Sequence, residues 1–197
     1  MTTGDVGYRY LLRALADSGH SDVIYEMNNQ SDKPGYGYQL KMGATSLTEK
    51  WDAGVGSFGS QNHFMLGQIN EWFFHDLAGI QSDPKGPGFQ KIIIKPAEPG
   101  DLEWVKATYN SVRGPIAVEW RREKDRFLLN VTVPPNTIAT IYLPAKSPEE
   151  VTESGVPLAK VSDVKFAGLK DLAVALEIGG GNYKFAVFPA PKGETGP

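Results

Sequence analysis

The spacing of apolar residues changes along the chain and first shows a helical period. Between residues 6 and 80, apolar side chains recur at intervals of three and four residues, which is typical of helices with one buried face. The first such segment follows Asp5, a residue that can cap a helix, and stops at Gly19. Ser21 and Asp22 can cap a second short helix, and a third begins near Tyr36. The first part of the chain is therefore predicted to consist of short helices.

The strongest helical pattern covers residues 63–80, HFMLGQINEWFFHDLAGI, and is apolar over most of the circumference of a helix. A helix of this kind is expected to be buried on several sides. The short helices predicted before it cannot cover so much apolar surface. We therefore expect this part of the chain to belong to a larger helical domain, and we expect the uncovered helix surface to make the isolated chain self-associate.

A second pattern begins after residue 88, where the period of the apolar positions falls from about 3.6 to about 2 residues. One example is the alternation of Ile116, Val118 and Trp120 with smaller or polar residues. Strands are predicted at 89–95, 102–112, 115–122, 126–133, 137–143, 172–178 and 182–188. Because no helix separates them, these seven short strands favour an antiparallel β-sandwich.

The same alternation predicts where three large aromatic side chains point. Trp104, Tyr109 and Trp120 are interleaved with valine and isoleucine, so we expect them to face the core of the sandwich. Exposed together on one face, they would instead suit a carbohydrate-binding surface. Their exposure therefore distinguishes a packed core from a sugar-binding module.

A boundary separates the two patterns. Residues 81–88, QSDPKGPG, contain two prolines and two glycines and are typical of a connecting segment. The predicted fold class is α+β, with helices in residues 1–82, a linker at 83–88 and a sandwich in residues 89–197.

Charge and hydropathy limit the partners that the chain is expected to have. The formal net charge is -3, and basic residues do not cluster beyond Arg121-Arg122, so neither nucleic acid nor an anionic membrane is a predicted partner. No apolar run approaches the roughly 20 residues of a membrane span, and no signal sequence is present. The sequence predicts a soluble chain and leaves its cellular location open.

Residue types also limit the chemistry. The chain has no cysteine, which excludes disulfides, thiolate catalysis and zinc–thiolate sites. Its three histidines, His20, His63 and His75, do not have the close spacing of metal ligands. The sequence therefore predicts no metal and no other cofactor, and any chemistry must come from carboxylates, histidine, hydroxyls or aromatic rings.

One carboxylate stands out in residues 43–52, GATSLTEKWD, where Glu49 comes two residues before Trp51. A carboxylate beside an indole is common in sugar sites, because the ring covers C–H patches of a pyranose while the carboxylate transfers protons. The alternative is an exposed glutamate in a short helical turn next to a core tryptophan. For Trp51 itself, contact with a sugar and packing in the core both stay open.

A glycine-rich loop follows at residues 53–60, AGVGSFGS, and leads to His63. The spacing of its glycines fits neither a Walker loop nor a dinucleotide fingerprint, and no strand precedes it, so we reject a nucleotide site. His63 is predicted at a helix N-terminus, where the helix dipole favours a neutral ring that donates one hydrogen bond and accepts another. Such a ring suits contact with a sugar hydroxyl, and simple packing or capping is the alternative.

With GAT at 43–45, Glu49, Trp51 and the pair Asn62-His63 in this order, the chain resembles the C-terminal part of a bacterial α-L-rhamnosidase of glycoside hydrolase family 78. The segment TGDVGYRYLLRALADSGHSDVIYEM resembles the family's barrel upstream of the catalytic base, and GQINEWFFHDLAGI resembles its last barrel helix. The segment GFQKIIIKPAEPGDLEWVKATYNSVRGPIAVEWRRE resembles the start of its C-terminal β-sandwich. The resemblance weakens after about Lys146.

The resemblance implies an (α/α)6 barrel, of which residues 1–80 supply only the last part, and inverting hydrolysis of terminal α-L-rhamnosyl bonds. The substrate implied is an L-rhamnose-containing glycoside. The family's pattern places the general base on Glu49 and a sugar-contacting histidine on His63, with Trp51 as a further candidate for substrate contact.

The general acid of the family belongs to an earlier barrel segment that no position in this chain matches. The isolated chain is therefore predicted to be catalytically silent and to need the upstream part of its parent enzyme as a partner. Two alternatives remain: a non-catalytic carbohydrate-binding or scaffold module formed by residues 89–188, and a fragment of another (α/α)6 glycosidase that acts on a different sugar.

Overall fold

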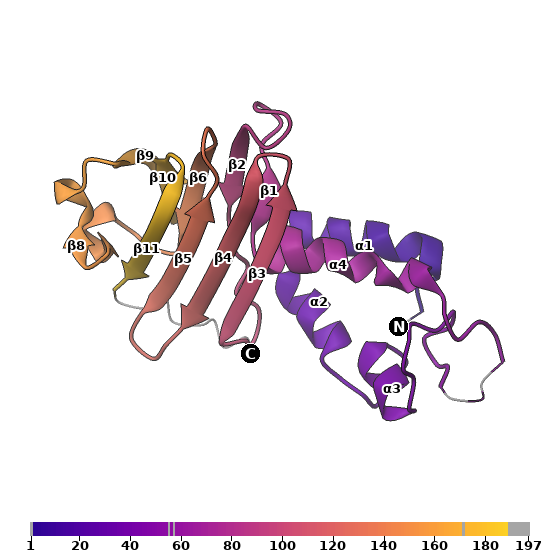
Figure 1. The fold of residues 1–197 in the computed structure, drawn as a ribbon. Coiled ribbons are helices and arrows are strands. Elements are labelled where there is room, and N and C mark those ends of the chain that lie inside the picture. Colours follow the sequence, from indigo (N-terminus) through magenta and orange to yellow (C-terminus); the bar gives the residue numbers. More distant parts are fainter. Residues whose placement is uncertain (1, 55, 57, 171, 189–197) are drawn as a thin grey trace. The chain divides into compact units, whose positions relative to one another are not determined.

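The structure of the protein is a computed structural model that describes residues 2–54, 56, 58–170 and 172–188. The chain forms two compact units. The helical unit contains the residues up to Phe73 together with Glu98–Gly100, and the sandwich unit contains Phe74–Ala97 and the residues from Asp101 onward. Helices make up the first unit and strands dominate the second (Figure 1), so the predicted α+β class is confirmed.

Three helices of the helical unit agree with the apolar spacing. Helix α1 spans Asp5–Asp17, α2 spans Ser21–Asn28 and α3 spans Tyr36–Lys41. Shortly after α1, Gly19 has a φ of 82°, a left-handed conformation that cannot continue a right-handed helix. The predicted stop at this glycine is confirmed.

The core of the helical unit is small and rich in aromatic rings. Tyr8 of α1 and Ile24 of α2 are buried together with Leu66 and Trp72 from the segment after residue 63. The indole Nε1 of Trp72 donates a hydrogen bond to Ser21 Oγ, with an N···O distance of 3.1 Å. This bond satisfies the one polar atom of a tryptophan that is otherwise surrounded by apolar groups.

The segment predicted as one long buried helix is divided in the structure. A 3-10 helix, η1, covers Phe64–Gln68, an α-helical turn, α4, covers Ile69–Trp72, and a π-helical turn, η2, covers Phe73–Leu77. The prediction of burial on several sides is wrong for the described residues, because Phe64 is 81% exposed and Phe73 is 42% exposed. Helix α1 packs against η1 and α4, and single contacts from Ser21 and Tyr36 reach the segment as well, but the rings of Phe64 and Phe73 stay in solvent.

The helical segment also ends earlier than predicted. Gly79 has a φ of 75°, and a Cβ there would lie 2.3 Å from the carbonyl carbon of Lys95, so only glycine fits. The chain then begins strand β1, Ile80–Ser82, which pairs antiparallel with β2, Lys91–Ile94. Residues 83–88, predicted as a linker, form the loop between these two strands, and the compact units divide before that loop.

The sandwich unit contains two sheets (Figure 1). The first sheet has the strand order β1-β2-β6-β10-β9, where β6 is Ile138–Leu143, β10 is Ala173–Ile178 and β9 is Val164–Lys170. Its neighbours pair antiparallel except for β2 and β6, which are parallel. The predicted antiparallel sandwich is therefore confirmed, with one parallel pairing in this sheet.

The second sheet is antiparallel throughout and has the strand order β3-β4-β5-β11-β7-β8. Its strands are β3 Trp104–Ser111, β4 Gly114–Arg122, β5 Phe127–Val133, β11 Gly181–Val187, β7 Val151–Glu153 and β8 Val156–Pro157. Two 3-10 turns, η3 at Pro148–Glu150 and η4 at Leu158–Lys160, accompany the short strands.

Of the strands that the described residues form, seven were predictable from alternation and four were not. The predicted strands correspond to β2, β3, β4, β5, β6, β10 and β11. Strands β1, β8 and β9 lie at sheet edges, and β7 has only three residues. At an edge, fewer side chains are covered on either face, so the apolar alternation that marks a strand is weak.

The core between the sheets contains one of the two predicted core tryptophans. Trp120 of β4 has no exposed surface, and its Nε1 donates a hydrogen bond to the carbonyl of Leu77 at 2.7 Å. Trp104 of β3, also predicted to face the core, is instead 54% exposed. Val105 and Ala107 take the inward positions of β3, and a shift of one residue in the alternation reverses the face of every side chain.

Tyr109, the third aromatic residue predicted for the core, is only partly covered. Its side chain is 39% exposed, and its ring lies 5.1 Å from the ring of Phe89, centroid to centroid. Since Trp120 is buried and Trp104 is exposed, the three aromatic residues do not form a single exposed face.

Candidate active site

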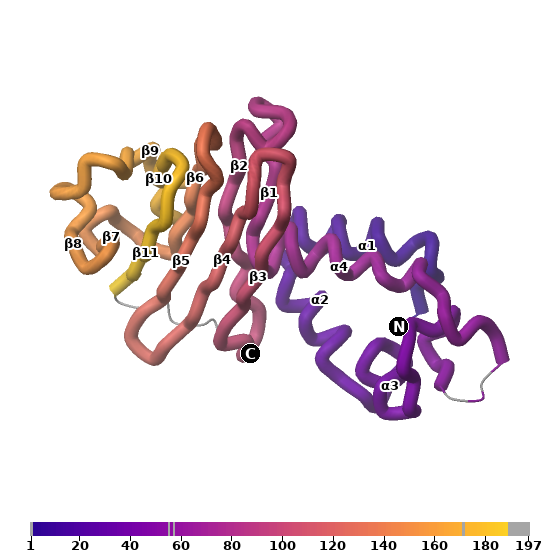
Figure 2. Tube along the Cα trace, in the orientation of Figure 1, coloured from indigo at the N-terminus to yellow at the C-terminus, as the bar shows by residue number. Residues whose placement is uncertain are grey.

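Two short segments that contain the candidate residues lie side by side in the helical unit. The amide of His63 donates a hydrogen bond to the carbonyl of Leu47 at 2.7 Å, and the amide of Glu49 donates to the carbonyl of Ser60 at 3.0 Å. These bonds close the loop that the chain follows between α3 and α4 (Figure 2). The glycine-rich loop thus folds back and brings the segments of Glu49 and His63 together.

Glu49 presents its carboxylate to solvent. The predicted helical turn is wrong here, since the described residues between α3 and η1 contain no helix. The neighbouring Thr48 is fully buried, and its hydroxyl donates to the carbonyl of Lys50 at 2.8 Å, while Glu49 is exposed. Glu49 Oε2 accepts a hydrogen bond from the amide of Ser60, with an N···O distance of 3.0 Å. This bond orients the carboxylate without removing it from water.

Gly59 allows the loop to approach that carboxylate. It has a φ of 111°, a conformation that side-chain-bearing residues rarely adopt, and a Cβ at this position would lie 3.4 Å from Glu49 Oε2. A glycine here therefore has a local reason, because the turn that presents the Ser60 amide to Glu49 needs this conformation, and an added Cβ would only touch the Glu49 carboxylate.

Trp51 belongs to a buried aromatic cluster formed by Tyr8, Tyr36 and Trp51. Its side chain is 7% exposed, and its ring centroid lies 4.8 Å from that of Tyr8 and 5.1 Å from that of Tyr36, both in edge-to-face geometry. Its Nε1 donates to the carbonyl of Thr3 at 2.7 Å. Of the two roles open for Trp51, the structure shows packing beneath the loop.

The two tyrosines of the aromatic cluster are held as neutral phenols. Burial raises the pKa of Tyr8 to about 12, and burial also raises the pKa of Tyr36. The Tyr8 hydroxyl donates to Asn28 Oδ1 at 3.1 Å, and the Tyr36 hydroxyl donates to the carbonyl of Leu66. These bonds connect α1 with α2 and α3 with η1, and so fix the base on which the loop rests.

His63 lies at the start of η1 and contacts a second carboxylate. Its Nε2 is 3.4 Å from Asp5 Oδ2 in the first turn of α1, and its side chain is half-buried. The residues after His63 continue without a break through η1, α4 and η2, so His63 stands at the N-terminal end of a helical segment. Asp5 engages Nε2 and leaves Nδ1 for another hydrogen bond.

Two features of the site are missed by the sequence pattern. The sequence pattern indicates only a capping role for Asp5. Its contact with His63 was missed because the two residues are 58 positions apart. Phe58 is 91% exposed, and Lys50 Nζ lies 5.6 Å from its ring centroid. An aromatic residue between a serine and a glycine is the only signal that the sequence offers for this exposed ring beside Glu49.

The other carboxylates of the helical unit have different surroundings. Glu71 forms a two-point ion pair with Arg9, with N···O distances of 2.7 and 3.2 Å, and so has a structural partner. Glu26 borders a separate hollow of about 450 Å³ together with Met27 and Lys33. Among the described residues, no group of three or more histidine or acidic side chains is placed to hold a metal ion, and no helix is long and apolar enough to cross a membrane.

The arrangement around the loop can perform one half of an acid–base reaction. An exposed carboxylate oriented by a backbone amide can accept a proton from water. A histidine held by Asp5 can form a hydrogen bond with a hydroxyl group through its other nitrogen. Hydrolysis of a glycosidic bond needs a second carboxyl group as general acid.

Two family descriptions match consecutive parts of the chain. Residues 1–77 match the bacterial alpha-L-rhamnosidase 6 hairpin glycosidase domain, and residues 79–156 match the bacterial alpha-L-rhamnosidase C-terminal domain. An alpha-L-rhamnosidase of Streptomyces avermitilis is 31% identical over 194 residues, and one of Formosa agariphila is 30% identical over 179 residues. These matches cover 95% and 87% of this chain, but in each case only 18% of the relative's length.

Solved structures give the same result. The chain is similar to the crystal structure of the Streptomyces avermitilis alpha-L-rhamnosidase complexed with L-rhamnose, with a TM-score of 0.82 over 95% of this chain and 18% of that one. It is also similar to the alpha-L-rhamnosidase from Dictyoglumus thermophilum, at 28% identity, with a TM-score of 0.83 over 95% of this chain and 21% of that one.

Proposed function

This chain belongs to the bacterial α-L-rhamnosidases, and we propose that it supplies the general base, Glu49, of an enzyme that hydrolyses terminal α-L-rhamnosyl bonds with inversion. The observation that carries the proposal is the pairing of residues 47–49 with 60–63. This pairing holds Glu49 and His63 on neighbouring segments and orients the Glu49 carboxylate through the Ser60 amide.

In the proposed reaction Glu49 removes a proton from a water molecule as that water attacks the anomeric carbon. A second carboxylic acid on the opposite face of the sugar protonates the departing oxygen, so the configuration at the anomeric carbon inverts. The two carboxyl groups of such a pair stand roughly 6.5–9.5 Å apart, which leaves room for the water. Exposure of Glu49 supports this role, since the attacking water must reach the carboxylate.

His63 is proposed to bind a hydroxyl of the rhamnosyl group through Nδ1, with Asp5 holding the ring at Nε2. Trp51 contributes through packing, because the buried indole supports the loop that carries Glu49. Phe58 is a candidate for stacking beside the substrate, given its exposed ring. The substrate class proposed is a glycoside that contains L-rhamnose.

The general acid is proposed to come from the segment that precedes the matched region in the longer relatives. Glu71 is engaged with Arg9, and Glu26 borders a different hollow, so neither carboxylate is assigned this role. The 197-residue chain alone is therefore expected to be inactive on rhamnosides, and its contribution is measurable only when the earlier segment is supplied.

A chimera tests the proposal. This chain replaces the matched segment of the Streptomyces avermitilis relative, and hydrolysis of an aryl α-L-rhamnoside is measured together with the anomeric configuration of the released sugar. We expect activity, an inverted product, and a fall in kcat of about 10²–10⁴-fold for Glu49→Gln, since this is the usual contribution of a general base. Glu26→Gln is the matched control and should retain activity.

Binding of L-rhamnose to each chimera distinguishes a lost base from a misfolded protein. Glu49→Gln should bind the sugar while it fails to hydrolyse the glycoside. Full activity of Glu49→Gln would remove Glu49 from the role of base. A chimera that binds L-rhamnose and hydrolyses no rhamnoside would overturn the proposed activity, and hydrolysis by the 197-residue chain alone would mean that it contains a general acid.

A further inference from the structure

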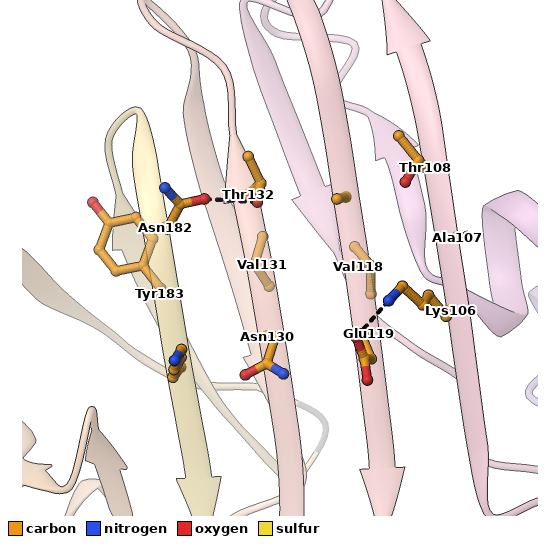
Figure 3. Close-up of a pocket in the computed structure, with 12 residues that line it drawn as sticks. Lys106, Ala107, Thr108, Val118, Glu119, Asn130, Val131, Thr132, Asn182 and Tyr183 are labelled. Carbon is orange, nitrogen blue, oxygen red and sulfur yellow. Dashed lines mark hydrogen bonds and ion pairs between the residues drawn. The ribbon is translucent and has the colours of Figure 1, made fainter.

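The outward face of the second sheet carries side chains in regular rows across β3, β4, β5 and β11. Paired residues on neighbouring strands stand opposite each other, so the register defines each row. The middle row consists of charged and amide side chains: Lys106, Glu119, Asn130 and Lys184. Lys106 Nζ lies 3.3 Å from Glu119 Oε2, as the dashed line in Figure 3 marks.

A second row beside it holds smaller polar groups: Thr108, Ala117, Thr132 and Asn182. The Thr132 hydroxyl donates to Asn182 Oδ1 at 2.8 Å, an arrangement that leaves the Asn182 amide nitrogen to donate elsewhere. Ala117 is the small residue between two threonines, and a hollow of about 390 Å³ lies over the two rows (Figure 3).

The third row adds an aromatic side chain on the other side of the middle row: Trp104, Arg121, Leu128 and Ala186. Trp104 is on the same face as Lys106, because alternate residues of a strand share a face and Val105 packs against the core. The indole is 54% exposed. An uncovered tryptophan is unusual for a side chain that gains so much from burial.

We propose that this β3–β11 face, made of the three rows above, binds an oligosaccharide that carries carboxylates. The indole of Trp104 offers a flat apolar surface for the C–H groups of a pyranose ring. In the adjacent middle row, the Lys106 ammonium, the Glu119 carboxylate and the Asn130 amide offer donors and acceptors for sugar hydroxyls. The third row and the middle row together provide the apolar and polar contacts that a sugar site needs, and the second row extends the polar surface beyond them.

Charge determines the class of sugar. The face contains three cations, Lys106, Arg121 and Lys184, against the single carboxylate of Glu119, while the whole chain has a formal net charge of -3. Two positive charges therefore remain on the face of a chain that is negative overall. Ammonium and guanidinium groups bind carboxylates through charge-assisted hydrogen bonds, so a uronate-containing glycan complements this face better than a neutral one.

The composition of the face argues against a protein as its occupant. Protein interfaces have an apolar centre with charged residues at the rim. Here the middle row is charged and polar, and the apolar side chains of Trp104 and Leu128 lie in a flanking row. The face consists of residues of the sandwich unit and uses no residue of the candidate active site, so this inference does not depend on the proposed hydrolase function.

Binding is tested by calorimetric titration of the 197-residue chain with tetragalacturonate, a carboxylated probe, and with cellotetraose, an uncharged probe of equal length. We expect tetragalacturonate to bind with a dissociation constant in the millimolar range or below, and cellotetraose to bind at least about tenfold more weakly. Raising the salt concentration from about 0.05 M to about 0.5 M should weaken the binding of tetragalacturonate, because salt screens exposed charges.

Variants of surface residues locate the binding. Trp104→Ala should weaken tetragalacturonate binding about tenfold, because Trp104 is the one aromatic side chain of the three rows and truncation of an aromatic anchor commonly has an effect of this size. Lys106→Gln should weaken it about threefold. Lys165→Gln is the matched control, since Lys165 forms an equivalent cross-strand pair with Glu177 at 3.4 Å on the first sheet. Leu169 lies on β9, the same edge strand as Lys165, and is 59% exposed. Leu169→Ala is therefore the control for loss of exposed apolar surface.

Three results would overturn the proposal. The first is no heat of binding with tetragalacturonate, the second is equal affinity for cellotetraose, and the third is unchanged binding after Trp104→Ala. Hydrolysis of rhamnosides by the chimera described above bears on none of these results, so the two proposals succeed or fail independently.

Discussion

The sandwich unit and the helical unit differ in how completely each closes its core. Between the sheets, Trp120, Phe127 and Leu129 have no exposed surface. In the helical unit, Tyr8, Ile24 and Leu66 are equally buried, but the extended hydrophobic cluster of the described residues lies within the sandwich unit. Two sheets that face each other bury one large continuous core, whereas a few short helices bury a small one. We therefore expect the sandwich to be the more stable unit and the helical unit to open first.

The candidate active site lies in the unit with the less complete core. Its segments are joined by backbone hydrogen bonds across a glycine-rich loop and rest on one aromatic cluster. The β3–β11 face, by contrast, is built on four neighbouring strands of one hydrogen-bonded sheet. Active-site loops commonly have lower local stability than the core. We therefore expect the helical unit to unfold at a lower denaturant concentration than the sandwich unit.

The largest effect should come from the core of the sandwich. Trp120→Ala removes a fully buried indole and leaves the Leu77 carbonyl without its donor, so unfolding of the sandwich should become easier by about 3–5 kcal/mol. Denaturant unfolding followed by far-UV circular dichroism should show the later of two transitions move while the earlier one stays. A shift of the earlier transition instead would contradict the assignment of the units.

Alkaline pH should act on the helical unit in particular. Tyr8 keeps its proton up to about pH 12 in the folded state, whereas an unfolded tyrosine loses it near pH 10. The unfolded state then binds fewer protons, so the contribution of Tyr8 is complete below about pH 10 and declines by about 3 kcal/mol as the pH rises to about 12. Tyr36, with a raised pKa, adds to this decline.

The measurement is the denaturation midpoint of the helical unit at several pH values between 8 and about 12. Tyr8→Phe should reduce the slope of that midpoint against pH, at the cost of the hydrogen bond to Asn28. The sandwich contains Tyr183, whose pKa burial also raises, but its half-exposed ring should give a smaller slope. An equal slope for Tyr8→Phe and the parent protein would remove Tyr8 as the source.

A smaller effect is expected at the loop that holds Glu49. Gly59→Ala adds a side chain at a φ of 111°, 3.4 Å from Glu49 Oε2, and should cost about 1–3 kcal/mol of local strain. In the chimera this strain should disturb the turn that presents the Ser60 amide to Glu49, and the rate of rhamnoside hydrolysis should fall about tenfold. Gly56→Ala is the matched control, because Gly56 also has a positive φ, 80°, but no atom lies within 4 Å of its added Cβ. Equal activities would mean that the contact with Glu49 has no catalytic consequence.

The smallest effect is expected at the exposed tryptophan of the sandwich. Trp104→Ala should change the unfolding free energy by no more than about 0.5 kcal/mol, because the indole is half in solvent and has no core contact to lose. The same denaturant unfolding experiment checks this value against Trp120→Ala. A loss as large as that of Trp120→Ala would show that Trp104 stabilises the sandwich, and would remove the argument that its exposure has a binding purpose.

The spacing of apolar residues was sufficient to predict those helices and strands that have one buried face and one exposed face. Helix α1 was predictable because three- and four-residue spacing and Gly19 reflect its buried stripe and its end. Strands β4 and β5 were predictable because their inner residues alternate strictly with outer ones. Edge strands such as β9 were not, since most of their side chains are exposed on both faces.

Residue identity did not determine which way a side chain faces. Trp104 and Trp120 lie on neighbouring strands with similar alternation, but only the register of β3 against β4 places one in solvent and the other in the core. Residues 63–80 are apolar enough for one long helix, yet the pairing of Ile80 with Ile94 in the sheet ends that helix at Gly79. Strand pairing joins distant residues, and a local pattern contains no information about it.

By itself, the sequence determined the two-part α+β organisation, most of the strands and, through its resemblance to a family, Glu49, Trp51 and His63 as candidates. The tertiary structure alone decided that Glu49 and His63 lie on paired segments, that Trp51 is packed beneath them, and that Asp5 reaches His63 across 58 positions. The reason is physical: periodicity records which face of an element is buried, whereas a site consists of contacts between elements, which form only when the chain closes its loops.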